Sequence, residues 1–290
     1  MLVAKQIFSF ASYFIENLRV LPNGTLLLST IVSPGLLYTL NPNANSRQAQ
    51  QVTTFSSNIT AVTGSARIPG HELYAVGGGL HTDYAFANNS MSLFVVSLAT
   101  DSIVKTIPVP GTLTMNGLVA LPNNPFTVLS ADSIGGRILR IDTLKSAVDV
   151  AFADPALGPG AGYVPPIGVN GLKMYGSYLY FTNSDLATFG RVLVDQDGNK
   201  AGAVEIVAYI DGAPDDFCFD GDGNAYIAVH PSSVVKITPW GVVTTIGEGD
   251  LFLQPTSVVL ANDAASLYVS TGGNGTSGGQ ILRIWLPKSN

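Results

Sequence analysis

The sequence has little cysteine, little charge and no long apolar segment. Its single cysteine, Cys218, excludes an intrachain disulfide, and the alternating pattern around it predicts a small buried side chain. No run of eighteen or more apolar residues occurs, so no membrane-spanning segment is predicted. Charged residues make up 12% of the chain and the net charge is −6, which leaves no basic stripe to neutralise phosphates. We therefore expect neither a nucleic acid nor a membrane as partner.

The sequence also has few histidines and no predicted signal peptide. The three histidines, at positions 71, 81 and 230, are far apart in the sequence and do not suggest a histidine-rich metal site. The first residues lack a continuous apolar region with a small-residue cleavage site, so they do not predict a signal peptide. These observations predict a cytoplasmic protein.

What the chain does contain is apolar residues and turn formers. Hydrophobic residues account for 46% of it, enough for a large core. Its 31 glycines and 17 prolines are scattered between short apolar runs, as an all-β chain with many turns requires. No stretch keeps a helical period for three turns, whereas alternating patterns are common.

One hairpin unit recurs along the chain. It consists of a short apolar strand, a turn rich in Pro, Gly, Asn or Asp, and a second strand that ends in small or polar residues. The six copies begin at Ile15, Ile59, Met115, Val169, Asp215 and Thr256. Steps of roughly 40–57 residues, with two further strands after most copies, are typical of a β-propeller. A β-sandwich is the alternative, but a regular sixfold hairpin repeat argues against it.

The last copy has only one further strand, at residues 280–287. Its missing outer strand is predicted to come from residues 3–10, which would close the ring and remove two exposed edges. We therefore predict that residues 1–290 form one domain, a six-bladed β-propeller with four strands per blade. Insertions at 77–92 and 157–167 are expected to cover one face.

In a propeller, the starts of the first strands and the ends of the second strands meet at one face around the axis. Polar side chains from six separate copies are therefore expected to lie close together at this face, as a binding site requires. The polar residues at the strand starts are Glu16, Asn17, Asn116, Asn170, Asp215, Asp216 and Thr256, and the strand ends add Asn183 and His230.

Three patterns in these copies resemble the senescence marker protein/gluconolactonase family. They are Glu-Asn-Leu-x-x-Leu-Pro-Asn-Gly from Glu16, Asn-Gly-Leu from Asn116 and Asn170, and Ala-Pro-Asp-Asp-Phe from Ala213. The resemblance implies a six-bladed propeller with a central divalent metal, and carries its ligands over to Glu16, Asn170 and Asp215. A carboxylate, an amide oxygen and a second carboxylate suit Ca²⁺.

The chain departs from that family at two places. Asp216 stands where the family has a glycine, which adds a carboxylate near the axis. Apolar Leu113 and Met115 stand where the lactonases carry the arginine and asparagine that grip a sugar lactone. Each lost charged hydrogen bond to a sugar costs about 1.5–3 kcal/mol. These changes point to a larger, more apolar ligand.

The first functional hypothesis follows from a fungal branch that the chain resembles, the hetero-Diels–Alderases of meroterpenoid biosynthesis. The resemblance implies that an o-quinone methide is captured by an apolar alkene such as humulene, with no cofactor strictly required. Asp216, His230 or Asp215 would supply the acid or base. The substrate would be bound by Asn17, Leu113, Met115, Asn116, Asn183 and Thr256.

Two alternatives remain open. One is a Ca²⁺-dependent lactonase or esterase, in which the metal on Glu16, Asn170 and Asp215 polarises the ester carbonyl. The other is a non-catalytic binding propeller, because a fold does not imply a function. Carboxylates that converge inside a channel are hard to explain in a passive scaffold, since unpaired buried charges are costly.

Overall fold

The structure is a computed structural model that describes residues 1–82, 85–161, 166–274 and 276–287. Within these ranges nearly all regular structure is antiparallel β-strand, and the helices are two 3-10 turns, η1 (Pro155–Leu157) and η2 (Asp250–Phe252). None of the described helices is long and apolar enough to cross a lipid bilayer. The all-β prediction is confirmed, and the fold is propeller-like.

Four of the sheets contain four strands each. Three of them are formed by strands consecutive in the sequence. These are β12 (Met115–Ala120), β13 (Thr127–Asp132), β14 (Arg137–Asp142) and β15 (Ala147–Ala153); β16 (Val169–Tyr175), β17 (Tyr178–Asn183), β18 (Thr188–Val194) and β19 (Lys200–Tyr209); and β20 (Ala213–Phe219), β21 (Ala225–His230), β22 (Ser233–Ile237) and β23 (Val243–Glu248).

The fourth of these sheets joins the two ends of the chain. Its strands are β24 (Pro255–Leu260), β25 (Ser266–Thr271), β26 (Gln280–Trp285) and β1 (Ala4–Ser9). Strand β1 pairs antiparallel with β26, from Ala4 opposite Ile284 to Ser9 opposite Gln280. The N-terminal run therefore supplies the outer strand that the C-terminal hairpin lacks, which is the pairing that the sequence predicted.

The first part of the chain forms one eight-stranded sheet, where the sequence predicted two separate sheets. Its two halves are β2 (Phe14–Val20), β3 (Leu26–Ile31), β4 (Leu36–Leu40) and β5 (Ala49–Thr54), and β6 (Ala61–Arg67), β7 (Leu73–Gly79), β10 (Ser92–Ser97) and β11 (Ser102–Pro108). A single bridging pair, Ile31 opposite Ala61, connects β3 to β6. The two halves are joined because the connection that leads into β6 hydrogen-bonds to the end of β3, where the N–H of Val32 donates to the carbonyl of Thr60 at 3.1 Å.

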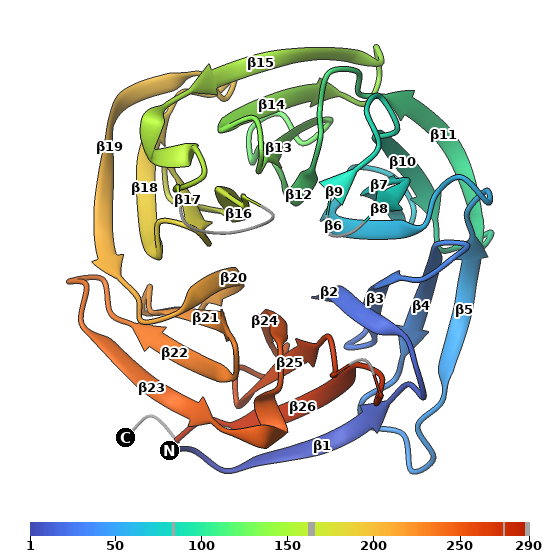
Figure 1. Ribbon diagram of the computed structural model, residues 1–290. Helices are drawn as coiled ribbons and strands as arrows, with labels where there is room; N and C mark the ends of the chain where they lie inside the picture. Colours follow the sequence, from blue (N-terminus) through green and yellow to red (C-terminus); the bar gives the residue numbers. More distant parts are fainter. Residues whose placement is uncertain (83–84, 162–165, 275, 288–290) are drawn as a thin grey trace.

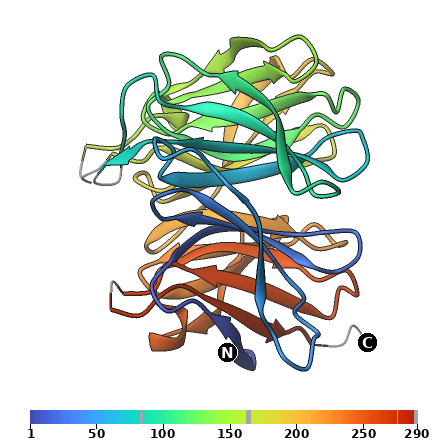
Figure 2. The same ribbon diagram turned by 90° about the vertical axis from the view of Figure 1, so that its right-hand side faces the viewer.

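The sheets are arranged around a central axis, with the first strand of each hairpin innermost (Figure 1). Strand β2 contacts β6, and the contacts continue through β12, β16, β20 and β24 back to β2. Seen from the side, the β8–β9 hairpin, formed by β8 (His81–Thr82) and β9 (Ala85–Phe86), stands out at one face of the ring (Figure 2).

The hydrophobic core is divided into clusters that lie between neighbouring sets of four strands. One cluster packs Leu129 and Ile138 of β13 and β14 against Leu172 and Phe181 of β16 and β17. The described residues form six such clusters, including one between the β20–β23 and β24–β26 sets. Each fully buried Leu or Phe stabilises the fold by about 1.5–3 kcal/mol. Because adjacent faces bury each other, the ring is held together by packing between sheets.

Candidate functional site

The six inner hairpins share one irregularity. In each, the strand register shifts near the start of the first strand, as a β-bulge does. The residues at these shifts are Glu16, Thr63–Gly64, Asn116–Gly117, Asn170–Gly171, Asp215–Asp216 and Thr256. A bulge leaves a residue outside the ladder and re-aims its side chain. The repeated bulge thus turns polar side chains toward the axis.

The glycines of three bulges allow neighbouring inner strands to approach closely. A Cβ on Gly64 would lie 2.5 Å from the carbonyl oxygen of Asn116, and one on Gly117 would lie 2.5 Å from that of Asn170. A Cβ on Gly171 would lie 2.7 Å from a carboxylate oxygen of Asp216. Any larger residue would therefore force adjacent sheets apart. This explains why Asn-Gly recurs in the sequence.

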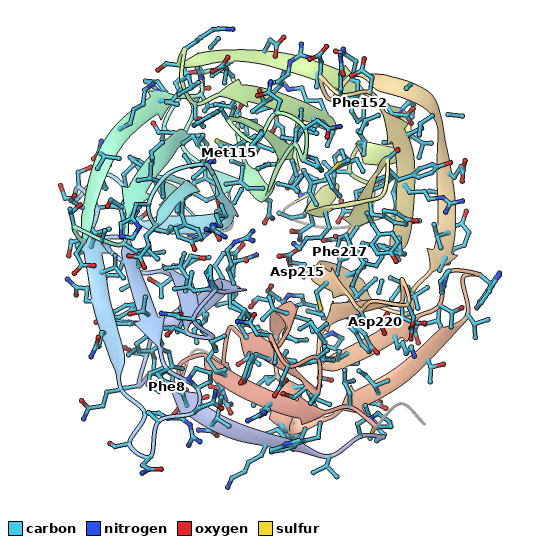
Figure 3. The ribbon with its side chains drawn as sticks, turned by 180° about the vertical axis from the view of Figure 1, so that it is seen from behind. Phe8, Met115, Phe152, Asp215, Phe217 and Asp220 are labelled. Atoms are coloured by element: carbon cyan, nitrogen blue, oxygen red, sulfur yellow. The ribbon has the colours of Figure 1, made fainter. Side chains whose placement is uncertain are left out.

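A cavity of about 380 Å³ opens where these bulges meet. Five bulge residues line it, namely Glu16, Thr63, Asn116, Asn170 and Asp215, and Asp215 points toward the centre of the ring in Figure 3. The other lining residues are Phe14, Ile31, His81, Phe86, Thr114, Ile167, Ser184, Asp185, Ala213, His230 and Gln254. No lysine or arginine occurs among these described lining residues. The cavity therefore combines apolar walls with carboxylates and, in its described lining, no lysine or arginine.

Asp215 and His230 form a pair at the cavity wall. The Nε2 atom of His230 lies 3.2 Å from Oδ2 of Asp215. Burial raises the pKa of the Asp215 carboxyl above its usual value, while the histidine opposes this rise. Their positions follow from the fold, because Ala213 of β20 pairs with His230 at the end of β21. The arrangement can move a proton to or from a ligand in the cavity.

Glu16 is the second carboxylate of the cavity. Burial, with added repulsion from Asp215 and Asp216, raises its pKa well above the usual value. A carboxyl group with a raised pKa retains its proton at higher pH, so it can donate a hydrogen bond where an ordinary glutamate would only accept one.

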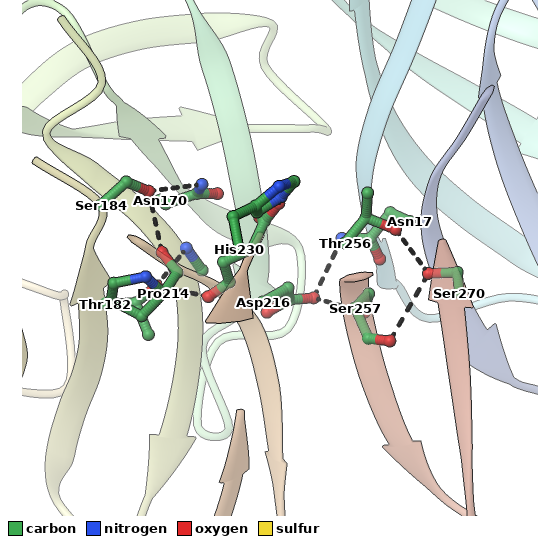
Figure 4. A network of polar contacts seen from close by, with 12 residues as sticks. Asn17, Asn170, Thr182, Ser184, Pro214, Asp216, His230, Thr256, Ser257 and Ser270 are labelled. Atoms are coloured by element: carbon green, nitrogen blue, oxygen red, sulfur yellow. Dashed lines mark hydrogen bonds and ion pairs between the residues drawn. The ribbon is translucent and has the colours of Figure 1, made fainter. Parts of the chain in front are cut away.

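Asn170 is oriented by a network beneath the cavity (Figure 4). The hydroxyl of Ser184 donates to the carbonyl of Pro214 at 2.8 Å, so it accepts from the Asn170 amide nitrogen at 3.0 Å. The Oδ1 atom of Asn170 is then left buried with no hydrogen-bond partner among the described residues. A buried acceptor of this kind is open to a ligand or a cation.

The three residues carried over from the gluconolactonase family have the oxygen ligand atoms that suit a divalent cation. Glu16, Asn170 and Asp215 all line one cavity, and the unpartnered Oδ1 of Asn170 is an oxygen donor of the kind that Ca²⁺ prefers. Within the described part of the chain, no three histidine, cysteine, aspartate or glutamate side chains are clustered so as to hold a metal. Any cation here would depend on the asparagine and on open positions for water or substrate.

Asp216, predicted as a catalytic acid, does not line the cavity. Its carboxylate is buried, accepts hydrogen bonds from Asn17 at 3.0 Å and Ser257 at 3.2 Å, and forms an ion pair with Lys173. Because every partner belongs to a different inner strand, Asp216 ties β2, β16 and β24 to β20. Its role is structural in this arrangement, since a paired, buried carboxylate is not presented to a substrate.

Most of the predicted substrate contacts also lie elsewhere. Asn116 lines the cavity, but Asn17 donates to Asp216, and Met115 is fully buried in the core beside Leu118. Leu113 is 38% exposed outside the cavity lining.

Asn183 and Thr256 have local structural partners instead. The amide of Asn183 donates to the carbonyls of Ala156 and Gly158 and thereby holds η1. The Thr256 hydroxyl donates to the carbonyl of Ile15 at 2.8 Å. Neither side chain is among the cavity-lining residues.

Sequence reasoning did not single out five polar lining residues: Thr63, Thr114, Ser184, Asp185 and Gln254. Thr63 could have been found, because Thr63-Gly64 occupies the position of the Asn-Gly pairs. Asp185 follows the end of β17, and burial raises its pKa, opposed by the backbone amides of Ile167 and Gly160. One of its carboxylate oxygens is buried and has no partner within the described part of the chain.

The two predicted insertions both contribute to the cavity. The first supplies His81 and Phe86, whose ring centroids are 5.3 Å apart, and the second supplies Ile167. Residues 83–84 and 162–165 of these insertions lie outside the described residues. The described parts place apolar and aromatic groups at the cavity, as expected for segments that cover one face.

Comparison with other proteins supports this picture at the level of fold. No family model matches the chain. A protein from Phoma sp named "Putative hetero-Diels-Alderase" is 24% identical over 291 aligned positions, which cover 89% of this chain and 83% of that protein.

Several solved structures share the architecture. A luciferin-regenerating enzyme superposes with a TM-score of 0.71 at 14% identity, covering 99% of this chain and 96% of its own. The calcium-binding protein regucalcin from Agrobacterium tumefaciens gives 0.69 at 16% identity, with 98% and 93% covered. A gluconolactonase from Xanthomonas campestris gives 0.67 at 12% identity, with 98% and 89% covered. The predicted resemblance to gluconolactonase-like propellers is confirmed.

Proposed function

We propose that this chain is a six-bladed propeller enzyme that binds a neutral, largely apolar small molecule in its central cavity and acts as a hetero-Diels–Alderase. Counting the eight-stranded sheet as two blades is supported by its single bridging pair and by the six inter-sheet clusters. The observation that carries the activity is the His230–Asp215 pair beside the apolar walls of Phe14, Ile31 and Phe86.

The substrate class follows from the character of the cavity. The described lining contains carboxylates and no lysine or arginine, so an anionic substrate would be repelled. Its volume of about 380 Å³ suits a small organic ligand. The aromatic and aliphatic walls favour a hydrocarbon such as a sesquiterpene alkene over a sugar.

The first step forms an o-quinone methide from an o-hydroxybenzyl alcohol. The His230 imidazolium donates a proton to the benzylic hydroxyl, the C–O bond breaks and water leaves. The phenolic O–H then gives up its proton, which returns to His230, so the enzyme regains its starting protonation. Asp215 stabilises the imidazolium throughout.

The second step joins the o-quinone methide to the alkene. One C–C bond and one C–O bond form together and no atom is lost. The apolar walls would hold the two reactants side by side in a fixed orientation. Binding then meets the entropic cost of bringing them together, which lowers the activation free energy of the reaction. Polar groups at the cavity base bind the quinone methide carbonyl, where negative charge develops.

The test is to incubate the protein with 2-(hydroxymethyl)phenol and humulene and to measure, by chromatography with mass detection, the adduct that corresponds to their sum less water. We expect product formation above the uncatalysed rate and a single enantiomer in excess. The His230→Gln variant is the control for the acid–base pair. Racemic product at the background rate would overturn the proposal.

A metal-dependent lactonase is the second candidate, favoured by the unpartnered Oδ1 of Asn170 beside Glu16 and Asp215. These three residues would hold Ca²⁺, which when bound would polarise an ester carbonyl. Hydrolysis of an apolar lactone that is lost on chelation and restored by Ca²⁺ would support this function. Hydrolysis that is absent with and without Ca²⁺ would exclude it.

A further inference from the structure

Gln254 adopts a backbone conformation that its neighbours disfavour. Its φ is 53°, in the left-handed region, and the following residue is Pro255. A residue before proline is pushed toward extended conformations, and non-glycine residues rarely adopt positive φ. Six other described non-glycine residues have positive φ, but each precedes a residue other than proline, and none lines the cavity.

The surrounding structure holds Gln254 in this conformation from both sides. Its N–H donates to the carbonyl of Pro231 at 2.8 Å, and its carbonyl accepts from the N–H of Gly272 at 2.7 Å. Pro231 directly follows His230, so the backbone of Gln254 is fixed to the segment that carries the histidine of the acid–base pair. Strained backbone conformations that the surrounding structure enforces cluster at ligand-binding and catalytic positions.

The side chain of Gln254 lines the cavity, half-buried, and makes no side-chain hydrogen bond to the described residues. Its amide is neutral and offers both a donor and an acceptor. Two other polar groups of the lining are already paired, Asp215 with His230 and the amide nitrogen of Asn170 with Ser184. Gln254 is therefore a neutral donor whose capacity is left for a ligand.

We propose that Gln254 is a ligand-positioning residue, whose side-chain amide donates a hydrogen bond to the carbonyl oxygen of a neutral apolar substrate. This inference rests on the proposed function, since it requires an apolar substrate in the cavity. It adds that the substrate carries a hydrogen-bond acceptor on the side of the cavity formed by the start of β24. A glutamate there would add a charge to a cavity that already holds Glu16 and Asp215.

The test compares two probes of nearly equal shape, 2-acetylnaphthalene and 2-isopropenylnaphthalene, which differ by a carbonyl oxygen in place of a methylene group. Binding is measured by calorimetry on the wild-type protein and on Gln254→Leu, which keeps the size of the side chain. We expect the wild type to bind the ketone about 3- to 10-fold more tightly than the alkene. Gln254→Leu should lose this preference or reverse it in favour of the alkene, because the ketone oxygen would be buried without a hydrogen-bond donor.

The matched control is Gln280→Leu, the same substitution in β26 outside the cavity lining, and it should keep the preference for the ketone. A wild type without that preference, or a Gln254→Leu variant that retains it, would overturn the role of Gln254 and leave the proposed function standing. Binding of neither probe by the wild type would instead count against the proposed function itself.

A second measurement tests the strain independently. Gln254→Gly should raise Tm by about 1–3 °C, because glycine adopts positive φ without penalty. Ala264→Gly, at a φ of 53° in the turn after β24, should raise Tm similarly without any change in ligand preference. A Gln254→Gly variant no more stable than wild type would contradict the strain on which the inference rests.

Discussion

The Nε2 atom of His230 lies 3.2 Å from Oδ2 of Asp215, and the two side chains come from the first and second strands of one hairpin. The pair joins an imidazole to a buried carboxylate whose pKa is raised by burial. The His230 side chain is 32% exposed and lines the cavity, so a ligand can reach the pair. Both side chains line the cavity, the geometry that the proposed acid–base role requires.

His230→Gln should slow the formation of the o-quinone methide by about 10²–10⁴-fold, because the proton donor is lost. Capture of a quinone methide generated photochemically in the presence of the protein should keep its rate and enantioselectivity, since the cavity walls are unchanged. Rapid kinetics on the two routes separate the steps. Equal loss on both routes would contradict a role in proton transfer.

Glu16→Gln should stabilise the protein at neutral pH by about 0.5–2 kcal/mol. Burial raises the folded-state pKa of Glu16 above 4.5, the value of an unburied glutamate. At pH values between 4.5 and this raised pKa, the protein therefore takes up a proton when it folds. Stability therefore falls as pH rises from about 4.5 through the raised pKa.

Chemical denaturation of the wild type and of Glu16→Gln from pH 4 to pH 9 measures this effect. The variant should show a flatter profile over that range. Glu205→Gln, on the outer strand β19, is the control and should leave the wild-type profile nearly unchanged. A variant less stable than the wild type at pH 8 would contradict this prediction, because it would show that the charged Glu16 carboxylate stabilises the folded protein.

Thr63→Val and Thr114→Val should leave the protein equally stable or up to about 1 kcal/mol more stable, because each hydroxyl oxygen is buried with no partner in the residues that the structure describes. Thr182→Val is the contrast. Its hydroxyl donates to the carbonyl of Asp215 at 2.7 Å and accepts from the N–H of Gly171 at 2.9 Å.

Loss of these two partners in Thr182→Val should cost about 1–3 kcal/mol. Calorimetric Tm values of the three variants provide the comparison. If Thr63→Val or Thr114→Val destabilised the protein as much as Thr182→Val, the hydroxyl in question would have to be hydrogen-bonded in solution.

Lys173→Met should destabilise the protein by about 2–4 kcal/mol, since it leaves the buried carboxylate of Asp216 without its cation. The double variant Lys173→Met/Asp216→Asn should recover much of this loss, because the amide can still bond Asn17 and Ser257. Urea denaturation of the single and double variants gives the coupling energy. A double variant less stable than Lys173→Met alone would argue against the ion pair as the cause.

Deletion of residues 1–10 should abolish cooperative unfolding or lower Tm steeply, because it removes β1 and exposes the edge of β26. A synthetic peptide of residues 1–10 added in trans should restore part of the stability by pairing with that edge. Differential scanning calorimetry with and without the peptide is the measurement. An unchanged Tm in the truncated chain would mean that β1 contributes nothing to the fold.

The hairpin repeat and the polar ends of its strands are readable from the sequence because each hairpin is a local pattern. Turn residues, strand alternation and the short C-terminal unit together predicted the all-β fold and the pairing of residues 3–10 with the last strand. The same repeat placed Glu16, Asn116, Asn170, Asp215 and His230 near the axis, and all five line the cavity. The sequence alone determined these features.

Only the tertiary structure decided which polar groups are available to a ligand. Asp215 and Asp216 are adjacent in the sequence, yet the bulge turns one to the cavity and the other to Lys173 and Asn17. Gln254 carries no sequence signal, because its positive φ accompanies hydrogen bonds to Pro231, which follows β21 of the neighbouring sheet, and to Gly272, which follows β25. Partners contributed by distant strands set orientation and pKa, and no local pattern contains them.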